Sequence, residues 1–324
     1  MKIRKLGYSD LEITRIGLGT WAMGGEDWAF AWGPQDDVAS IAAIHKALDL
    51  GINWIDTAAV YGIGHSEEVV GKAVAGRRAK VIIATKCGRV LVPGSITPVP
   101  RLKAESVREE LEASLRRLGT DYIDLYQIHW PDPDPDIEEG WTEIARQVKA
   151  GKIRYAGVSN FSVAQIKRLQ KIHPVASLQP PYSMLRRDVE AELLPFCGAN
   201  GIGVIVYSPM QAGLLAGRFT RERARQLPDS DWRKRSPYFT EPALSANLTL
   251  VERLKALAGK KGRSAAEIAI AWVLRRPEVT AAIVGGRGPE QVKQTRGGAD
   301  WDLTPAEIAE IDAIIAQREA TKLS

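Results

Sequence analysis

Short runs of apolar, strand-like residues alternate with longer amphipathic stretches almost from one end of the sequence to the other. Eight strand–helix units can be counted, and their expected strands cover residues 16–19, 53–56, 81–84, 123–128, 155–158, 176–179, 204–207 and 281–284. Strands separated by helices predict a parallel sheet with crossover connections. Eight repeats close a barrel, whereas a doubly wound sheet usually has about six strands. The pattern therefore predicts an α/β fold, a (β/α)8 TIM barrel.

Two segments lie outside this repeat. Residues 2–14 have the pattern of a small hairpin that would cover the barrel floor, and residues 304–317 read as an extra C-terminal helix with Thr304 as its N-cap. The sequence between them contains no linker or low-complexity stretch, so we expect residues 1–324 to form a single domain. The loops at 21–34, 130–136 and 210–246 are longest. Each follows a strand, on the side of a barrel where active sites are built.

The charge and cysteine content exclude several functions. The 324 residues carry 44 basic and 39 acidic side chains, a net charge of +5. The basic clusters at 221–225 and 233–235 read as solvated loop charges, so no nucleic-acid partner is expected. Two cysteines and the absence of a leader or membrane-length apolar run predict a cytoplasmic protein without a membrane partner. The four histidines do not pair at metal-ligand spacing, and no metal site is expected.

Polar residues terminate most of the expected strands. Any one of them has an ordinary structural explanation, such as turn capping by an aspartate or a lysine that reaches solvent. In a closed barrel, however, these strand ends meet at one rim, so residues far apart in sequence become neighbours. The strand-end residues are Asp56, Lys86, His129, Ser159, Asn160, Gln179, Tyr207 and Ser208.

Asp56 and Lys86 end adjacent strands and can form a buried ion pair, which by itself is a poor source of stability. Tyr61 lies five residues after Asp56, on the loop above the rim. A tyrosine hydroxyl titrates near ~10, and a nearby ammonium is expected to lower that pKa. With His129 to orient the substrate oxygen, the Tyr61 hydroxyl could donate a proton to that oxygen as it becomes anionic when hydride reaches the neighbouring carbon.

These residues carry a family resemblance. The stretches 56–62 and 67–71, together with Thr85-Lys86, residues 128–130, 157–161 and 207–209, are similar in sequence and order to the motifs of the aldo-keto reductases. The similarity runs from about Leu6 to about Thr295. It implies reduction of an aldehyde or ketone with a nicotinamide cofactor, the substrate being a small aldehyde or a sugar. It also implies a catalytic tetrad of Tyr61, Asp56, Lys86 and His129, with Tyr61 as the general acid.

The same resemblance implies the cofactor contacts. Ser159, Asn160 and Gln179 would hold the nicotinamide carboxamide, and Tyr207 would stack on the ring. Ser208, Pro209, Gly213, Leu214 and Arg218 would lie over the pyrophosphate, and Gly285, Gly286, Arg287, Gln291 and Thr295 around the adenosine phosphate. The remaining expected cofactor contacts are Gly19, Thr20, Trp21 and Asp56. A phosphate site after strands seven and eight is common in barrels.

Two positions depart from the family pattern, because many members have a basic residue in place of Gly285 and an asparagine in place of Thr295. Arg287 can compensate, since a guanidinium can grip a 2′-phosphate. NADPH is therefore expected over NADH, and Glu290 is the residue that could reverse this choice.

Four tryptophans fall on rim loops, and an aromatic substrate pocket formed by Trp21, Trp28, Trp32 and Trp130 is expected. Trp28 and Trp32 could instead anchor only their own loop. The segment Gly62-Ile63-Gly64 is read as the turn before a helix N-capped by Ser66, and Cys87 as a packed thiol.

Two other functions stay open at this point. One is a cofactor-binding regulatory or sensor subunit with slow turnover. The other is an isomerase or aldolase that uses Lys86 as a Schiff-base former, a role that pairing with Asp56 disfavours. A monomer is expected, because no extended apolar surface segment is visible in the sequence.

Overall fold

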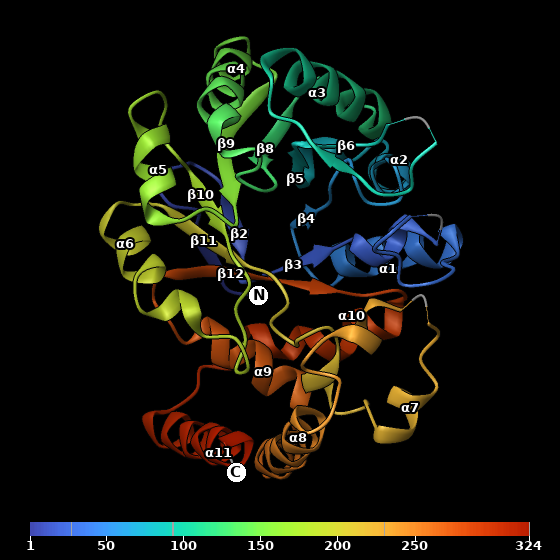
Figure 1. Cartoon of the computed structure of the whole chain (residues 1–324), viewed down its shortest axis with the longest axis vertical. Helices are drawn as coiled ribbons and strands as arrows, with labels where there is room; N and C mark the ends of the chain where they lie inside the picture. Colours follow the sequence, from blue (N-terminus) through green and yellow to red (C-terminus); the bar gives the residue numbers. More distant parts are fainter. Residues whose placement is uncertain (27, 93, 230, 324) are drawn as a thin grey trace.

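The computed structural model describes residues 1–26, 28–92, 94–229 and 231–323. Its centre is a closed barrel of parallel strands (Figure 1) in the order β10-β11-β12-β3-β4-β5-β8-β9. The barrel strands are β3 (Ile16–Gly19), β4 (Trp54–Asp56), β5 (Ile82–Cys87), β8 (Ile123–Ile128), β9 (Ile153–Ser159), β10 (Ser177–Gln179), β11 (Gly203–Val206) and β12 (Val279–Gly285). The predicted (β/α)8 barrel is confirmed.

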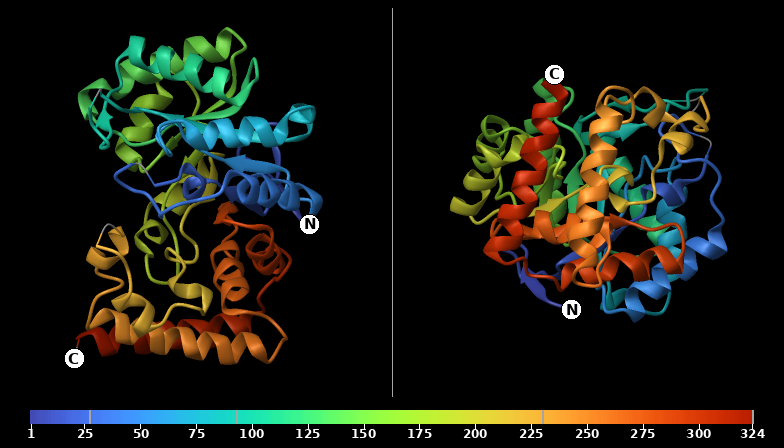
Figure 2. Two further views of the ribbon diagram at one scale, coloured as in Figure 1. Left: turned by 90° about the vertical axis from the view of Figure 1, so that its right-hand side faces the viewer. Right: turned by 90° about the horizontal axis from the view of Figure 1, so that it is seen from below.

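Helices surround the barrel (Figure 2), and helices such as α3 (Ala104–Leu118) and α4 (Ile137–Lys149) bury an apolar face while most of their charged residues stay outside. No helix in the described part of the chain is both long and apolar enough to cross a bilayer. The helices are α1 (Asp37–Asp49), α2 (His65–Val74), α3 (Ala104–Leu118), α4 (Ile137–Lys149), α5 (Val163–Gln170), α6 (Leu193–Ala199), α7 (Arg221–Arg225), α8 (Ala243–Gly259), α9 (Ala265–Leu274), α10 (Pro289–Thr295) and α11 (Pro305–Leu323).

Several helix starts follow from local side-chain caps. Ser162 and Ser264 form reciprocal capping boxes at the starts of α5 and α9. The prediction for α2 was wrong: Gly64, in the left-handed conformation at φ 97°, is its N-cap. Ser66 lies inside the helix instead, where its buried hydroxyl donates to Thr20 Oγ1 at 2.8 Å. Its side chain thus joins α2 to the loop after β3.

The N-terminal hairpin has the predicted place. Strands β1 (Ile3–Lys5) and β2 (Glu12–Thr14) pair antiparallel, and Leu6, Leu11 and Ile13 pack with interior residues of the barrel strands. At the hairpin turn Gly7 has φ 55°, and a side chain there would begin 2.5 Å from the backbone nitrogen of Gly203. The hairpin therefore closes the floor and leaves the opposite rim as the open face.

The extra C-terminal helix is also confirmed. It is α11, which packs beside α8 at the lower edge of the molecule (Figure 1). A further short hairpin, β6 (Arg89–Val90) with β7 (Val99–Pro100), follows β5 on the open rim and was not predicted.

Candidate active site

A buried ion pair lies where β4 and β5 end. Lys86 Nζ donates to Asp56 Oδ1 at 2.7 Å and to the Thr57 carbonyl at 2.8 Å. Both charged side chains are at least 96% buried. Burial lowers the pKa of Lys86, and the neighbouring Asp56 opposes that shift. The pair predicted from adjacent strand ends is present.

Tyr61 is held above this pair. Its hydroxyl lies 3.5 Å from Lys86 Nζ, and its ring packs between those of Trp21 and Trp28, with centroids 6.3 Å and 6.0 Å away. The predicted direction of its pKa shift was wrong. Burial, and then the charge of Asp56, raise the pKa of Tyr61 well above its ordinary value. The desolvation of a phenolate outweighs the ammonium, so the hydroxyl keeps its proton in the unliganded site.

His129 completes this cluster at the end of β8. Its ring lies edge-on to Tyr61, with centroids 5.8 Å apart. Burial, and then the positive charges of Lys86 and Arg89, lower the pKa of His129 well below its ordinary value. The imidazole is therefore neutral at neutral pH and can take part in a hydrogen bond without adding charge.

A chain of amides and hydroxyls continues around the rim from β9 to β11. Gln179 Nε2 donates to Asp56 Oδ2 at 2.8 Å, and Asn160 Nδ2 donates to Ser159 Oγ and to the His129 carbonyl, each at 3.0 Å. Tyr207 in turn donates to Asn160 Oδ1 at 2.9 Å. The rim residues are thus locked in place before any ligand binds, which lowers the cost of binding one.

These groups border a single cavity of about 1430 Å³. It runs from Tyr61 and His129 past Tyr207 to the segment after β12. Of the predicted cofactor and substrate residues, Leu214 is buried in the hydrophobic core and does not line it. Those that do line it are Gly19, Thr20, Trp21, Trp28, Trp32, Asp56, Trp130, Ser159, Asn160, Gln179, Tyr207, Ser208, Pro209, Gly213, Arg218, Gly285, Gly286, Arg287, Gln291 and Thr295.

The cavity walls fit an extended dinucleotide. Gly213 and Gly285 border the cavity, and a side chain added at either would meet only open space. The end after β12 is rich in cations: Arg263, Arg287 and Lys293 line it against Glu267 and Glu290. Uncrowded backbone and positive charge are what a pyrophosphate and an adenosine phosphate need.

Arg287 already has partners. Its Nε donates to Gln35 Oε1 at 2.6 Å, and its Nη2 donates to the Pro34 carbonyl. The backbone N–H of Arg287 donates to Gln291 Oε1 at 2.7 Å. The segment after β12 is therefore tied to the loop before α1, and Arg287 lines the cavity at that junction.

Tryptophans line one side of the cavity, and a further tryptophan that was not predicted packs against them. Trp232, on the excursion after β11, stacks on Trp21 with centroids 5.9 Å apart and meets Trp32 edge-on at 6.0 Å. Trp232 was missed because the sequence of a long loop does not show which of its residues pack back onto the barrel. The neighbouring Arg233 was wrongly taken as solvated: it is 8% exposed, pairs with Asp231 and covers the Trp32 ring at 4.7 Å.

Glu110 on α3 supports the turn that follows Lys86. Its carboxylate accepts the Gly88 N–H at 3.0 Å, and it is 7% exposed. Burial raises its pKa from an ordinary value of 4.5 to about 7, against the opposing hydrogen bonds. The adjacent Cys87 is also buried, and burial raises its pKa, consistent with a packed thiol.

Glu110 should therefore make stability depend on pH. The folded state holds the Glu110 proton up to a pH of about 7 and the unfolded state only to about 4.5, so the free energy of unfolding falls as pH rises between these values. Glu110→Gln removes this loss, and its stability relative to wild type should rise by about 2 kcal/mol between pH ~5 and ~8. Urea unfolding at both pH values measures this difference in stability.

Glu109→Gln, an exposed change on the same helix, is the control. A pH-independent difference for Glu110→Gln would contradict the assignment.

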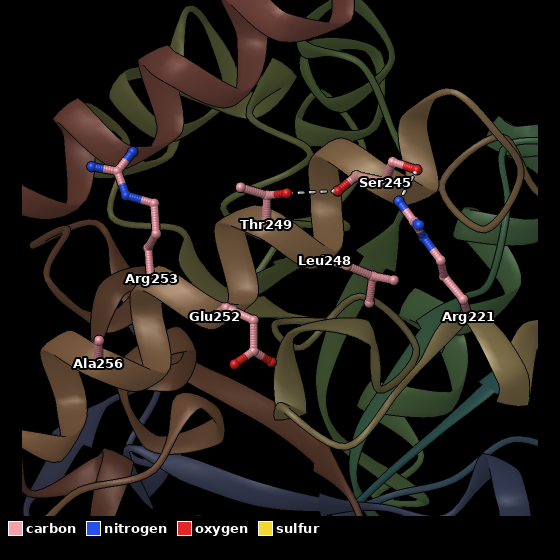
Figure 3. Close-up of a pocket in the computed structure, with 7 residues that line it drawn as sticks. All are labelled: Arg221, Ser245, Leu248, Thr249, Glu252, Arg253 and Ala256. Atoms are coloured by element: carbon pink, nitrogen blue, oxygen red, sulfur yellow. Dashed lines mark hydrogen bonds between the residues drawn. The ribbon is translucent and has the colours of Figure 1, made fainter.

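A second hollow lies on the outer face of α8, away from the barrel rim (Figure 3). It has a volume of about 460 Å³, and Arg221 Nη2 donates to Ser245 Oγ across it at 2.7 Å. None of the predicted site residues lines it. The main cavity is therefore the candidate active site. No group of histidine, cysteine or acidic side chains in the described ranges is arranged to hold a metal ion.

The structure thus places a buried Asp–Lys pair, a tyrosine and a histidine beside one cavity of a closed eight-stranded barrel. This combination is that of a barrel oxidoreductase. Comparison with known proteins gives the class. Residues 15–316 match the model of the aldo/keto reductase family, and the chain belongs to this family, whose members are oxidoreductases that act on carbonyl groups with a nicotinamide cofactor.

Two curated relatives match nearly the whole chain. It is 38% identical over 318 residues to the aldo-keto reductase YhdN of Bacillus subtilis, covering 97% of this chain and 94% of the relative. It is 35% identical over 320 residues to the NADH-specific methylglyoxal reductase of Escherichia coli, covering 95% and 96%.

Solved structures agree. The glycerol dehydrogenase AKR11B4 of Gluconobacter oxydans superposes with a TM-score of 0.89 at 38% identity, covering 98% of this chain and 95% of that one. The holo form of the aldo-keto reductase AKR11C1 of Bacillus halodurans superposes with a TM-score of 0.80 at 30% identity, covering 97% and 96%.

Proposed function

We propose that this chain reduces a small aldehyde or a sugar to the alcohol with NADPH, using Tyr61 as the proton donor and Asp56, Lys86 and His129 as its partners. The observation that carries the proposal is the placement of Lys86 Nζ, 2.7 Å from Asp56 and 3.5 Å from the Tyr61 hydroxyl. This geometry places the transferable proton of Tyr61 beside the fixed positive charge of Lys86, at the base of an aromatic-walled cavity.

Ser159, Asn160, Gln179 and Tyr207 would hold the nicotinamide, and the chemistry that the bound cofactor would supply is a hydride for the carbonyl carbon. Tyr61 holds its proton until then, because its pKa is raised. Once the substrate oxygen becomes anionic it is a stronger base than a phenolate, and Tyr61 transfers its proton to that oxygen. Lys86 stabilises the phenolate that forms, while Asp56 keeps the ammonium in place. His129, neutral and edge-on to Tyr61, orients the substrate oxygen.

The same geometry argues against a Schiff-base mechanism. Lys86 is fully buried and is not among the described residues that line the cavity, so its amine has no path to a substrate carbonyl. A paired ammonium is also a poor nucleophile.

NADPH is proposed as the preferred cofactor, on the strength of Arg263, Arg287 and Lys293 at the adenosine end of the cavity. The Escherichia coli relative is an NADH-specific enzyme by name, so the preference needs its own test. We further propose that the chain is a single-domain, cytoplasmic monomer.

Arg287→Ala should raise the Michaelis constant for NADPH about tenfold or more and that for NADH less than twofold, because a charge-assisted hydrogen bond to the 2′-phosphate is lost. Gln35→Ala removes one hydrogen bond between Arg287 and the loop, leaves the bond to the Pro34 carbonyl and keeps the charge, so it should affect both cofactors alike. Steady-state assays with both cofactors measure this. Equal effects of Arg287→Ala on the two constants would remove Arg287 from the phosphate site.

Oxidation of NADPH and NADH by the purified protein, followed by absorbance against a panel of aldehydes and aldoses, tests the proposal as a whole. Turnover that prefers NADPH supports it. Tight cofactor binding without turnover on any carbonyl would instead favour the alternative that the chain is a regulatory or sensor subunit.

A further inference from the structure

Arg89 is a cavity residue to which the tetrad and the cofactor positions give no role. It comes three residues after Lys86, starts the short strand β6, and lines the cavity with His129 and Trp130. In the barrel order β5 lies four strands from β11 in either direction. Arg89 therefore stands across the rim from the loop proposed to cover the pyrophosphate, at the end of the cavity left for substrate.

The Arg89 side chain is held in a defined position. Its Nη1 donates to Asp132 Oδ2 at 3.1 Å, and its guanidinium lies 6.0 Å from the centre of the Trp130 ring. Its backbone follows Gly88, whose N–H Glu110 accepts. Only 19% of the side chain is exposed. A side chain fixed in this way loses little entropy when it binds a ligand.

The charge balance at this end differs from that at the cofactor end. Asp132 neutralises Arg89, while Tyr61 and His129 are uncharged and Lys86 is paired with Asp56. The Trp130 ring lies beside Arg89, and the cavity lining also includes the apolar or aromatic Trp21, Trp28, Phe30 and Pro98. The guanidinium thus offers N–H donors in a fixed plane, and the carboxylate of Asp132 offsets its positive charge. That combination suits a neutral substrate whose hydroxyl groups accept hydrogen bonds, more than it suits a carboxylate.

We propose that Arg89 is a specificity-determining residue that donates hydrogen bonds to a hydroxyl of a neutral, hydroxylated carbonyl substrate. The inference rests on the proposed function for the identity of the reacting carbonyl. It adds a polar anchor in an otherwise aromatic pocket. A site built to hydrogen-bond a hydroxyl discriminates strongly against the analogue that lacks it.

The test compares two three-carbon aldehydes, glyceraldehyde and propanal, which differ in two hydroxyl groups. Arg89→Met keeps an unbranched side chain that fills the space of the arginine stem, and it removes the N–H donors. We expect its kcat/KM for glyceraldehyde to fall ten- to a hundredfold and that for propanal to change less than threefold. Arg168→Met, which removes an aspartate-paired arginine on α5 outside the cavity, is the matched control. Equal losses on both aldehydes, or no loss on either, would overturn the proposal.

Glyoxylate, which carries a carboxylate next to its aldehyde, tests the charge argument. Wild type should prefer glyceraldehyde to glyoxylate, and Asp132→Asn, which leaves Arg89 charged, should shift this ratio several-fold toward glyoxylate. A wild-type preference for glyoxylate would contradict a neutral substrate.

A binding measurement separates this inference from the proposed reaction. Intrinsic tryptophan fluorescence of the cofactor-loaded protein can be titrated with glycerol and with 1-propanol. Glycerol binding that weakens tenfold in Arg89→Met, with 1-propanol binding unchanged, supports the anchor even if no turnover is found. Unchanged glycerol binding together with normal turnover would leave the proposed function standing and reject the role of Arg89.

Discussion

Tyr61→Phe is expected to lower kcat by about 10³-fold, within the range of ~10²–10⁴ that a positioned acid contributes. The ring contacts with Trp21 and Trp28 do not involve the hydroxyl, so the pocket should keep its shape. Loss of the proton donor leaves the developing alkoxide to be protonated by water. Single-turnover kinetics with saturating cofactor would measure the chemical step directly.

Cofactor binding separates this loss from misfolding. The dissociation constant for NADPH, measured by tryptophan quenching, should match wild type within about twofold, because the proposed role of the hydroxyl is toward the substrate and not the dinucleotide. Tyr8→Phe removes a hydroxyl at the barrel floor and is the control for a general effect. Wild-type turnover by Tyr61→Phe would show that another group is the acid.

Lys86→Met is expected to lose both activity and stability. Removing one partner of a buried ion pair leaves Asp56 charged and unpaired, which costs about 3–5 kcal/mol. The Thr57 carbonyl loses its donor as well. The phenolate that forms on Tyr61 loses its neighbouring charge, so kcat should fall by at least ~10²-fold. Urea unfolding and steady-state kinetics measure the two effects.

A double variant separates the two effects of Lys86. Asp56→Asn combined with Lys86→Met removes the unpaired charge and should recover most of the lost stability, since the amide can still accept from Gln179. Its activity should stay as low as that of Lys86→Met alone. If restored stability brought back activity, Lys86 would be a structural residue only.

Much of this site could be predicted because parallel strands bring their ends together. Asp56, Lys86 and His129 each follow an apolar run, and the eightfold repeat places those runs in one closed barrel. The hydrophobic periodicity of each segment, and with it the number of strands, can be read from the local sequence. The pairing of Asp56 with Lys86 follows from strand adjacency alone.

The features of the site that could not be predicted from the sequence depend on the three-dimensional surroundings of each residue. The pKa shift of Tyr61 was predicted in the wrong direction, because counting a nearby ammonium ignores the cost of desolvating a phenolate at this site. Trp232 and Arg233 were missed or misread, because nothing in a long excursion says where it returns to the body of the protein. Ser66 looked like an N-cap by residue type, yet the preceding glycine takes that place.

The closure of the barrel by β3 and β12 has a consequence for how the chain acquires its structure. Ile16 pairs with Ala282, so the first barrel strand meets its second neighbour only after nearly the whole chain has left the ribosome. Until then the nascent polypeptide has two unpaired sheet edges, at β3 and β11, and such edges are templates for aggregation. Contacts so distant in sequence also slow folding. Production of this protein in quantity should therefore respond more to slower synthesis or added chaperones than to surface substitutions.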